Sequence, residues 1–505
     1  MLEIQHLSLT LKKENRPLLR DFSFVLGPRD KAALIGEEGN GKSTLLQALC
    51  RREQVEAYCD VEGRVFTGNS RLGYLAQEMP EEERRLPLRA FFDGVDLYEN
   101  GLLWELELSP DWLESDRPAG SLSGGEKVKA RLARLLAGAP DILLLDEPTN
   151  DLDIPALEWL EGFIRQSPRP ILFISHDETL LENTATVILH LEQVRRKTVP
   201  RHTVAALGYA DYVRARRLGL DKQEQVARKQ RAEYEAQMKR WRQIYDRVDH
   251  EQSAISRQDP GGGRLLKKKM KGLLSQEKRI ERQAGTFEEI PDVEDAIDCR
   301  FSAAITLPQG KTVLDFQLDC LRAGDRPLAR DVRLHVAGPR RVAILGENGR
   351  GKTTLLRLIW EELRLRRDIR AGYMPQNYGD VLDDRQTPVD YLAPSGDKER
   401  RTKACTLLGS LKFTPDEMRR PIAALSGGQK AKLLLAGLLL DGCDVLVLDE
   451  PTRNLSPLSC PVIREALSAY GGAILSVTHD RKFMREVCTD WYELTETGLR
   501  PLERL

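Results

Sequence analysis

The 505-residue chain contains the same set of short motifs twice, in the same order. The sequence LSGGEK at residues 122–127 recurs as LSGGQK at residues 425–430, and an aliphatic run followed by Asp-Glu-Pro-Thr also occurs in both halves. From the leucine of the first motif to the aspartate of the second is 24 positions in each half, and from that aspartate to a histidine is 30. This repetition at fixed spacing predicts two copies of one domain, at residues 1–205 and 293–505.

Each copy opens its motif set with a glycine-rich loop between an apolar strand and a helix. The strands are expected at residues 31–35 and 342–345. In the pattern Gly-x-x-x-x-Gly-Lys-Ser/Thr, backbone N–H groups surround a phosphate, the lysine reaches the β- and γ-phosphates, and the hydroxyl is a Mg²⁺ ligand. The loops therefore predict two sites for ATP and Mg²⁺. The expected ATP-binding residues of the loops are Gly36, Gly39, Gly41, Lys42, Ser43 and Thr44, and Gly346, Gly349, Gly351, Lys352, Thr353 and Thr354.

Acidic residues follow the central apolar strand of each copy. Residues 142–145 run into Asp146 and Glu147, and the same pattern leads to Asp449 and Glu450 in the second copy. Two adjacent carboxylates after a buried strand are unfavourable unless they hold a cation. We expect each aspartate to be a Mg²⁺ ligand and each glutamate to polarise the water that attacks the γ-phosphate.

A glutamine and a histidine at loop positions complete the predicted chemistry. Gln77 and Gln376 follow short strands, where a neutral amide can bind both ATP-bound Mg²⁺ and the attacking water. His176 and His479 follow the next strand and are candidate sensors of the γ-phosphate. A single glutamine or histidine at such a position more often has a structural role. Because both recur at equivalent positions in the two copies, we favour the functional interpretation. The expected Mg²⁺ ligands are Ser43, Gln77, Asp146, Thr353, Gln376 and Asp449.

The Leu-Ser-Gly-Gly motif of each copy opens a helix. Serine at a helix start is usually only a cap, but small residues at a helix N-terminus also form an anion site, and the duplication favours this second interpretation. The ATP-contacting residues expected here are Ser123, Gly124 and Gly125, and Ser426, Gly427 and Gly428. From the loop lysine to the glutamine is 35 positions in the first copy and 24 in the second, which predicts a smaller lobe in the second copy.

Together these motifs resemble those of ATP-binding cassette (ABC) ATPases, over both copies. The resemblance implies an α/β fold, with two P-loop ABC ATPase domains in tandem that pair head to tail. One ATP would lie between the Lys42 loop and residues 426–428, and the other between the Lys352 loop and residues 123–125. ATP then closes the pair and hydrolysis opens it. The catalytic residues carried over are Glu147, Glu450, His176 and His479.

The second copy departs from the family pattern after its Asp-Glu-Pro-Thr motif. Residues 453–456 end in serine, whereas the first copy has Asp153 at that position. In the family this segment crosses to the opposite site, so we expect the Lys42 site to hydrolyse ATP at a different rate, with both sites active. The family also stacks adenine on an aromatic side chain; Leu11 takes that place here, and residues 318–321 lack an aromatic too. We therefore expect no aromatic side chain to stack on the adenine base in either copy.

Residues 206–292, between the copies, form a charged segment. Residues 221–282 hold 17 Lys and Arg against 10 Asp and Glu, and residues 264–282 hold 8 against 2, although the net charge of the chain is −1. Apolar residues recur at steps of three, four and seven on both sides of a Pro-Gly-Gly-Gly break, which predicts a long antiparallel α-helical hairpin with a first helix of about 50 Å at residues 220–252. The two apolar seams are Tyr234, Met238, Trp241, Tyr245 and Val248, and Leu266, Met270, Leu273 and Ile280. A rigid spacer or a dimerising coiled coil is the alternative.

Two cassettes in one chain with such a linker resemble the ABC-F family. In that family the linker enters the ribosomal exit-tRNA site and contacts peptidyl-site tRNA, so the resemblance implies a ribosome partner through rRNA and tRNA. It also implies a translation factor, and the lack of a sizeable insertion between residues 42 and 122 favours a member that protects ribosomes from antibiotics. The residues expected to bind RNA phosphates are Arg264, Lys267, Lys268, Lys269, Lys271, Lys278, Arg279 and Arg282.

Other features limit the classes of function. The chain has no run of about 18 apolar residues and no secretory signal at its start. Its eight cysteines are scattered without a Cys-x-x-Cys pair, which favours the reducing cytoplasm. We expect a monomer whose two copies pair within the chain. Two alternatives stay open: the motor of a transporter with a separate membrane subunit, and a DNA-maintenance ATPase that uses the coiled coil structurally.

Overall fold

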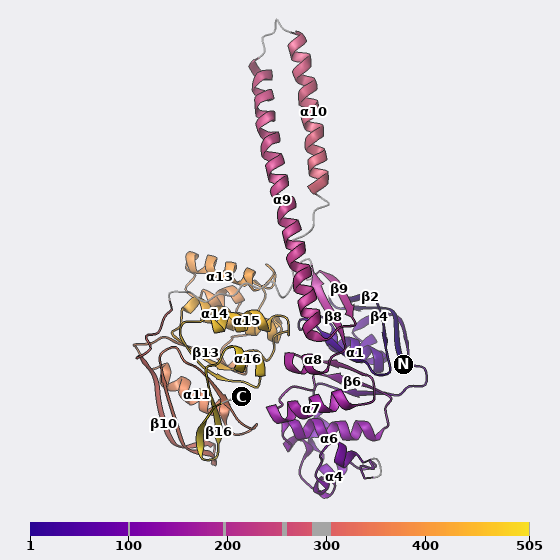
Figure 1. Ribbon diagram of the computed structural model, residues 1–505, viewed down its shortest axis with the longest axis vertical. Helices are drawn as coiled ribbons and strands as arrows, with labels where there is room; N and C mark the ends of the chain where they lie inside the picture. The colour runs from indigo at the N-terminus through magenta and orange to yellow at the C-terminus, as the bar shows by residue number, and fades with distance from the viewer. Residues whose placement is uncertain (99–100, 195–197, 255–259, 285–304, 504–505) are drawn as a thin grey trace. The chain divides into compact units, whose positions relative to one another are not determined.

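The computed structural model describes residues 1–98, 101–194, 198–254, 260–284 and 305–503 (Figure 1). The chain divides into two compact units, one of Met1–Ala210 with Val293–Leu505 and the other of Asp211–Asp292. Seven cysteines are free thiols, and Cys299 lies outside the described residues. Across the described ranges, no helix is both long and apolar enough to cross a membrane.

The first copy is built on a six-stranded sheet and a three-stranded sheet. Its strands are β1 (Leu2–Leu11), β2 (Arg16–Leu26), β3 (Lys31–Ile35), β4 (Cys59–Phe66), β5 (Leu72–Leu75), β6 (Ile142–Asp146), β7 (Ile171–Ile174), β8 (Val187–Val194) and β9 (Val199–Ala205). Its helices are α1 (Lys42–Cys50), α2 (Arg52–Glu56), α3 (Glu81–Arg85), α4 (Leu88–Phe91), α5 (Leu102–Glu105), α6 (Gly124–Ala137), α7 (Ile154–Gln166) and α8 (Glu178–Thr184). The large sheet has the order β5-β6-β7-β3-β8-β9, parallel except at β9, and the small antiparallel sheet is β2-β1-β4.

The second copy repeats this architecture with one strand fewer in its described residues. Its strands are β10 (Thr312–Ala323), β11 (Arg326–Ala337), β12 (Arg341–Leu345), β13 (Ala371–Met374), β14 (Val445–Asp449), β15 (Ala473–Val477), β16 (Asp490–Thr495) and β17 (Gly498–Leu502). Its helices are α11 (Lys352–Leu363), α12 (Pro388–Leu392), α13 (Lys398–Ser410), α14 (Gly427–Asp441), α15 (Cys460–Ser468) and α16 (Arg481–Glu486). The sheet order β13-β14-β15-β12-β16-β17 matches the first copy. Residues 364–370 form no strand corresponding to β4, which accounts for the shorter spacing.

Three neighbouring parallel strands set the position of the candidate site in each copy. In the first copy β6, β7 and β3 are adjacent, and each is a continuous buried apolar run, as parallel strands covered on both faces require. The carboxyl ends of adjacent parallel strands lie at one edge of the sheet. The loops after these strands, which carry the predicted phosphate-binding, acidic and histidine residues, therefore come together.

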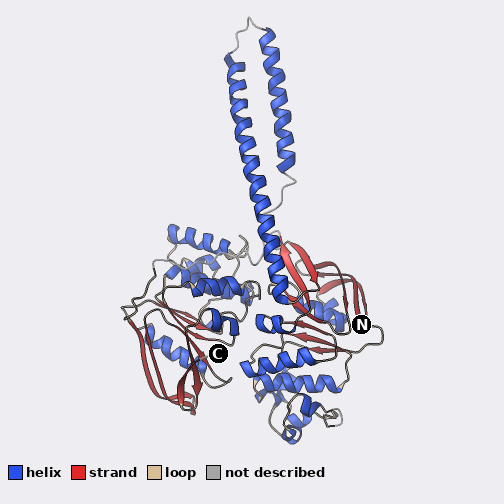
Figure 2. Cartoon of the chain, in the orientation of Figure 1, coloured by secondary structure: helices blue, strands red, loops and turns tan. Residues whose placement is uncertain are grey.

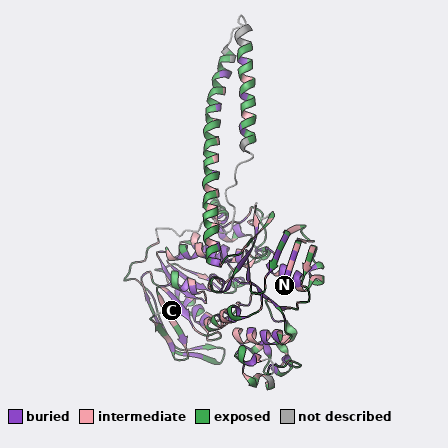
Figure 3. Cartoon of the chain, turned by 45° about the vertical axis from the view of Figure 1, so that its right-hand side comes forward, coloured by how far each residue is buried: buried purple, intermediate pink, exposed green. Residues whose placement is uncertain are grey.

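The linker forms the predicted antiparallel helical hairpin, α9 (Tyr209–Ala254) and α10 (Pro260–Ala284), whose helices lie side by side (Figures 1 and 2). Seven of the nine predicted seam residues, all except Tyr234 and Ile280, pack together between the helices, and the Trp241 Nε1–H donates to the Leu273 carbonyl at 2.9 Å. The outward faces are exposed (Figure 3). Together with the two P-loop sheets, the hairpin confirms the predicted fold class.

The predicted ends of the hairpin helices are partly wrong. The first helix begins 11 residues before the expected residue 220. The Pro-Gly-Gly-Gly sequence does not lie between the two helices, as expected, but forms the first turn of α10. Proline suits that position, because its missing N–H has no helical partner there and its φ is already helical. Residues 255–259, which belong to the expected tip, lie outside the described residues.

Candidate active sites

The two glycine-rich loops have nearly identical backbones. Gly39 and Gly349 have φ angles of 81° and 80°, in the left-handed region. A Cβ at Gly36 would collide with the Leu191 carbonyl oxygen, so only glycine fits where the loop leaves β3. Lys42 folds back over the loop, with its Nζ 2.7 Å from the carbonyl oxygen of Gly36, and Lys352 makes the equivalent 2.7 Å contact. Both buried ammonium groups thus face the hollow of their own loop.

The aspartate at the end of each central strand lies beside the loop hydroxyl. Ser43 Oγ donates to Asp146 Oδ1 at 2.9 Å, and the Tyr74 hydroxyl donates to the other carboxylate oxygen at 3.0 Å. In the second copy Thr353 Oγ1 lies 3.4 Å from Asp449 Oδ1. Asp449 Oδ2 is buried and has no hydrogen-bond partner among the described residues, and burial raises the pKa of Asp449 to about 6.

These oxygen atoms fit a Mg²⁺ ion. A buried carboxylate oxygen without a donor, next to a hydroxyl, is the arrangement that a hard cation with oxygen ligands requires. In the described part of the chain, no group of three or more His, Cys, Asp and Glu side chains could hold a metal alone. The ion would therefore complete its coordination with phosphate oxygens and water, as Mg²⁺ commonly does at nucleotide sites.

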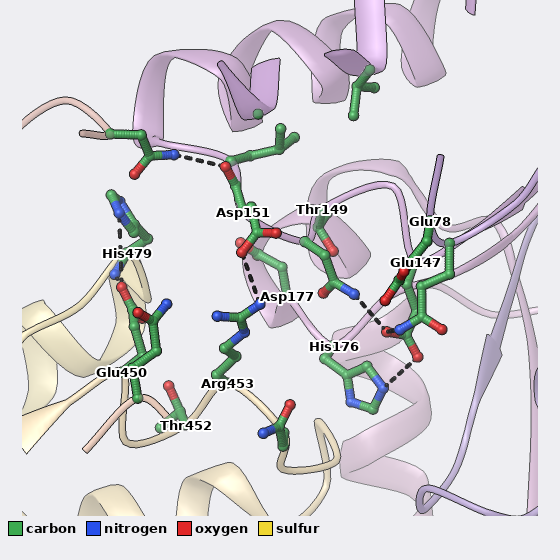
Figure 4. Close-up of a pocket in the computed structure, with 18 of the residues that line it drawn as sticks. Glu78, Glu147, Thr149, Asp151, His176, Asp177, Glu450, Thr452, Arg453 and His479 are labelled. Atoms are coloured by element: carbon green, nitrogen blue, oxygen red, sulfur yellow. Dashed lines mark hydrogen bonds and ion pairs between the residues drawn. The ribbon is translucent and has the colours of Figure 1, made fainter. Parts of the chain in front are cut away.

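Glu147 lies at the centre of a hydrogen-bond network in the first copy (Figure 4). Gln77 and Asn150 each donate an amide N–H to its Oε2, at 2.8 and 2.9 Å, and His176 Nε2 lies 3.3 Å from its Oε1. Burial alone would raise the pKa of Glu147, but the hydrogen bond and charge of His176, the hydrogen bond from Asn150 and the charge of Lys42 lower it to about 2. The carboxylate is therefore held ionised.

Glu450 lies in the opposite electrostatic environment. Its Oε1 is 3.7 Å from His479 Nε2, and the backbone N–H of His479 donates to its Oε2 at 3.3 Å. Burial and the neighbouring Asp449 raise the pKa of Glu450 to about 8, and burial lowers the pKa of His479 to about 4. Glu147 and Glu450 both have φ near +50°, a strained conformation for a glutamate that the two sites share.

The segments after the Asp-Glu-Pro-Thr motifs cross between the copies. The carbonyl oxygen of Leu455 accepts a hydrogen bond from His176 Nδ1 at 2.9 Å. Arg453 forms a 2.8 Å ion pair with Asp151, whose carbonyl also accepts from the Asn348 amide at 2.7 Å (Figure 4). Each site therefore receives groups from the other copy, and Ser456, in place of a carboxylate, belongs to the segment that faces the Lys42 site.

The Ser-Gly-Gly residues begin α6 and α14, and in both helices the serine forms a capping box. The backbone N–H of Gly428 donates to Glu38 Oε2 at 2.8 Å, and Lys432 Nζ forms a 2.8 Å ion pair with Glu37 Oε1. The first phosphate loop thus places a carboxylate at the N-terminus of α14, where a negative charge is favoured. The second loop has Asn348 at the position of Glu38.

A cavity of about 1230 Å³ joins the loops of the two copies. Leu11 lines it, and the second copy contributes Ala323 and Leu328 rather than residues 318–321. The predicted residues that line the cavity are Gly39, Gly41, Lys42, Ser43, Thr44, Gln77, Gly124, Glu147, His176, Gly349, Gly351, Lys352, Thr353, Thr354, Gln376, Asp449, Glu450 and His479. Those outside its lining are Gly36, Ser123, Gly125, Asp146, Gly346, Ser426, Gly427 and Gly428.

Several residues of the site were not predicted from the sequence. These residues hydrogen-bond to predicted ones: Tyr74 to Asp146, Asn150 to Glu147, and the backbone carbonyl of Leu455 to His176. No sequence pattern indicated these three contacts. Glu38 did leave a signal, because the otherwise similar second loop has Asn348 at its position.

The basic residues predicted on the hairpin share one property. All eight side chains are exposed, because α10 turns its apolar positions toward α9. None of the eight forms an ion pair with another described residue. They are Arg264, Lys267, Lys268, Lys269, Lys271, Lys278, Arg279 and Arg282.

Comparisons with known proteins agree with this architecture. The family model described as ABC transporter matches residues 19–150 and 329–453. The ribosome protection protein VmlR of Bacillus subtilis (strain 168) is 30% identical over 93% of this chain and 82% of its own length. ABC transporter F family member 5 of Arabidopsis thaliana is 27% identical over 93% of this chain and 72% of its own.

A solved structure shows the same fold. The archaeal ribosome recycling factor aABCE1, in its crystal structure with the ribosomal stalk protein aP1, matches 98% of this chain and 90% of its own with a TM-score of 0.60. Its sequence is 15% identical. The family match, the duplicated sites and the relatives matched over most of this chain lead to one conclusion: this chain belongs to the ABC-F family of ATP-binding cassette proteins and is an ATPase with two ATP-binding domains.

Proposed function

We propose that this ATPase acts on the ribosome, where the hairpin of residues 206–292 enters the exit-tRNA site and contacts rRNA and peptidyl-site tRNA. The observation that carries the proposal is the basic face of α10, with eight exposed Lys and Arg that have no carboxylate partner among the described residues. Such a face neutralises RNA phosphates. The chain would be a cytoplasmic monomer that serves as a translation factor or protects the ribosome from antibiotics.

The proposed chemistry is the same in the two domains, residues 1–205 and 293–505. The loop lysine and glycines hold the ATP phosphates, and the Ser-Gly-Gly residues of the other copy contact the γ-phosphate. Mg²⁺, when bound, supplies Lewis acidity at the phosphate oxygens, and the loop hydroxyl, the aspartate and the glutamine are the residues that would hold it. Glu147 and Glu450 orient and polarise the attacking water, and His176 and His479 position these carboxylates.

A chain of contacts links the Lys42 site to the base of the hairpin. His176 Nδ1 contacts the carbonyl oxygen of Leu455, and two residues later the Pro457 carbonyl accepts a 3.0 Å hydrogen bond from the Tyr209 hydroxyl. Tyr209 is buried and is the first residue of α9. A shift of residues 455–457 on ATP binding or hydrolysis would therefore act on the start of the helix. We expect Tyr209→Phe to leave ATP binding intact and to weaken the ATP dependence of ribosome binding.

Sedimentation with ribosomes tests the proposal. The double variant Glu147→Gln/Glu450→Gln binds ATP without hydrolysing it, so it should pellet with ribosomes in ATP and not without nucleotide. Replacing Lys267, Lys268 and Lys269 with alanine in this background should weaken pelleting and reduce its salt dependence, because fewer phosphates are neutralised. The control replaces three exposed basic residues of α13, Lys398, Arg401 and Lys403, and should pellet normally.

Three outcomes contradict the proposal. Absence of the trapped variant from the ribosome pellet in ATP refutes it directly. Co-purification with a membrane protein instead would support the transporter-motor alternative, and a preference for duplex DNA over rRNA would support the DNA-maintenance alternative. Cryo-EM of the trapped variant on ribosomes then locates the hairpin, and a drug-susceptibility panel on expressing cells separates antibiotic protection from general translation.

A further inference from the structure

A group of ion pairs joins the two copies at a distance from the phosphate loops. Arg464 of α15 is 3% exposed at its side chain and forms a two-pronged ion pair with Glu178, the first residue of α8. Arg481, the first residue of α16, pairs with Glu161 of α7, and both side chains are nearly buried. Lys482 adds a 3.2 Å contact to Glu178. In these pairs the first copy supplies every acid and the second copy every base.

The internal repeat relates these two main pairs to each other. Glu161 and Arg464 each lie 15 positions after the aspartate of the Asp-Glu-Pro-Thr motif, and Glu178 and Arg481 each lie 32 positions after it. The pair Glu178–Arg464 is therefore the counterpart of Arg481–Glu161, with the two copies exchanged. At both equivalent positions the first copy is acidic and the second is basic.

This charge pattern distinguishes between possible partners of a cassette. A first copy paired with another first copy would bring Glu161 against Glu178 twice, and two second copies would bring Arg464 against Arg481 twice. Like charges in a nearly buried interface are strongly unfavourable, because each loses its hydration and its partner from the other copy. Of the two arginines, Arg464 would keep an ion pair with Glu486 of its own copy. Only a first copy with a second copy satisfies all four groups.

We propose that these four residues form a recognition surface by which each cassette accepts only the opposite cassette as its partner. The surface lies next to the catalytic histidines, since Glu178 and Arg481 each follow a histidine by two residues. The ion pairs do not involve the phosphate-binding loops. This inference concerns the pairing of the domains and does not depend on the ribosome.

Charge exchange in the full-length chain tests the proposal. The variant Glu161→Arg/Glu178→Arg makes every group of the surface basic, and Arg464→Glu/Arg481→Glu makes every group acidic. Each should lower ATP turnover at least ten-fold, since both ATP sites need groups from both copies. The variant that carries all four substitutions again pairs opposite charges, with the bases now in the first copy and the acids in the second. Its turnover should recover to within about three-fold of that of the unmodified chain.

A matched control and a second readout separate pairing from folding. Glu158→Arg/Arg485→Glu reverses exposed charges on the same helices α7 and α16 and should leave turnover unchanged. Thermal unfolding of each variant shows whether the individual domains still fold. Turnover of the fourfold variant no higher than that of the two double variants, with all three folded, would overturn the proposal. So would full activity of either double variant.

Discussion

Replacing Glu38 with asparagine should strengthen ATP binding at the Lys42 site. In the structure the Glu38 carboxylate accepts a 2.8 Å hydrogen bond from the backbone N–H of Gly428. That N–H belongs to the Ser-Gly-Gly group proposed to contact the γ-phosphate. The carboxylate therefore competes with ATP for the donor and adds a negative charge beside the phosphates.

The size of the effect follows from this contact. A hydrogen bond to a charged acceptor contributes about 1.5–3 kcal/mol, and the exposed position of Glu38 favours the lower end. Losing a competitor worth about 1.5 kcal/mol should lower the Kd for ATP about ten-fold. Asparagine is the matched replacement, since Asn348 takes the same place in the second loop.

The assay titrates a fluorescent ATP analogue against full-length chains with one site disabled. In the Lys352→Ala background, which leaves the Lys42 site, the Kd of Glu38→Asn is compared with that of the parent. The reciprocal control, Asn348→Glu in the Lys42→Ala background, should bind more weakly, because it loses the 2.7 Å bond to the Asp151 carbonyl and adds charge. An unchanged or higher Kd for Glu38→Asn would refute the competition.

Three further predictions have defined outcomes. Glu147→Gln and Glu450→Gln should each lower ATP turnover, and together by about 100-fold or more, in steady-state phosphate release; unchanged turnover in Glu450→Gln would mean that the second site does not hydrolyse ATP. Trp241→Ala should destabilise the hairpin by about 3–5 kcal/mol in chemical denaturation, whereas Trp104→Ala, at an 84% exposed side chain, should have little effect. Burial lowers the pKa of Lys31 to about 8, so between about pH 8 and 10.5 the unfolded chain binds more protons than the folded chain. The contribution of Lys31 to the free energy of unfolding should therefore rise with pH across this window. The difference in stability between the unmodified chain and Lys31→Met, from denaturation curves at several pH values, should shift in favour of the unmodified chain by that rise.

The sequence predicted the fold because the fold depends on local patterns, and the motif residues proposed for each site come from the same local patterns. Residues 31–35 form the expected strand, and the paired seams of Trp241 and Leu273 pack as the heptad spacing requires. Contacts between segments far apart in the chain were not predictable in this way. The contact between His176 and the backbone carbonyl of Leu455 does not depend on the identity of the Leu455 side chain, so the sequence could not indicate it. The glycines after Pro260 suggested a break between helices, whereas in the structure they belong to the first turn of α10.

Differences between the two copies contain information that the shared motifs do not. Phosphate chemistry requires the same lysine, hydroxyl and carboxylates twice, so equivalent positions there agree. Pairing requires complementary groups, so equivalent positions at the contact must differ, as Glu161 and Arg464 do. Glu38 and Asn348 also differ, and both lie where one copy contacts the other. In this chain a mismatch of charge at equivalent buried positions, as at Glu161 and Arg464, therefore marks a contact between the copies, whereas identity marks the shared catalytic chemistry.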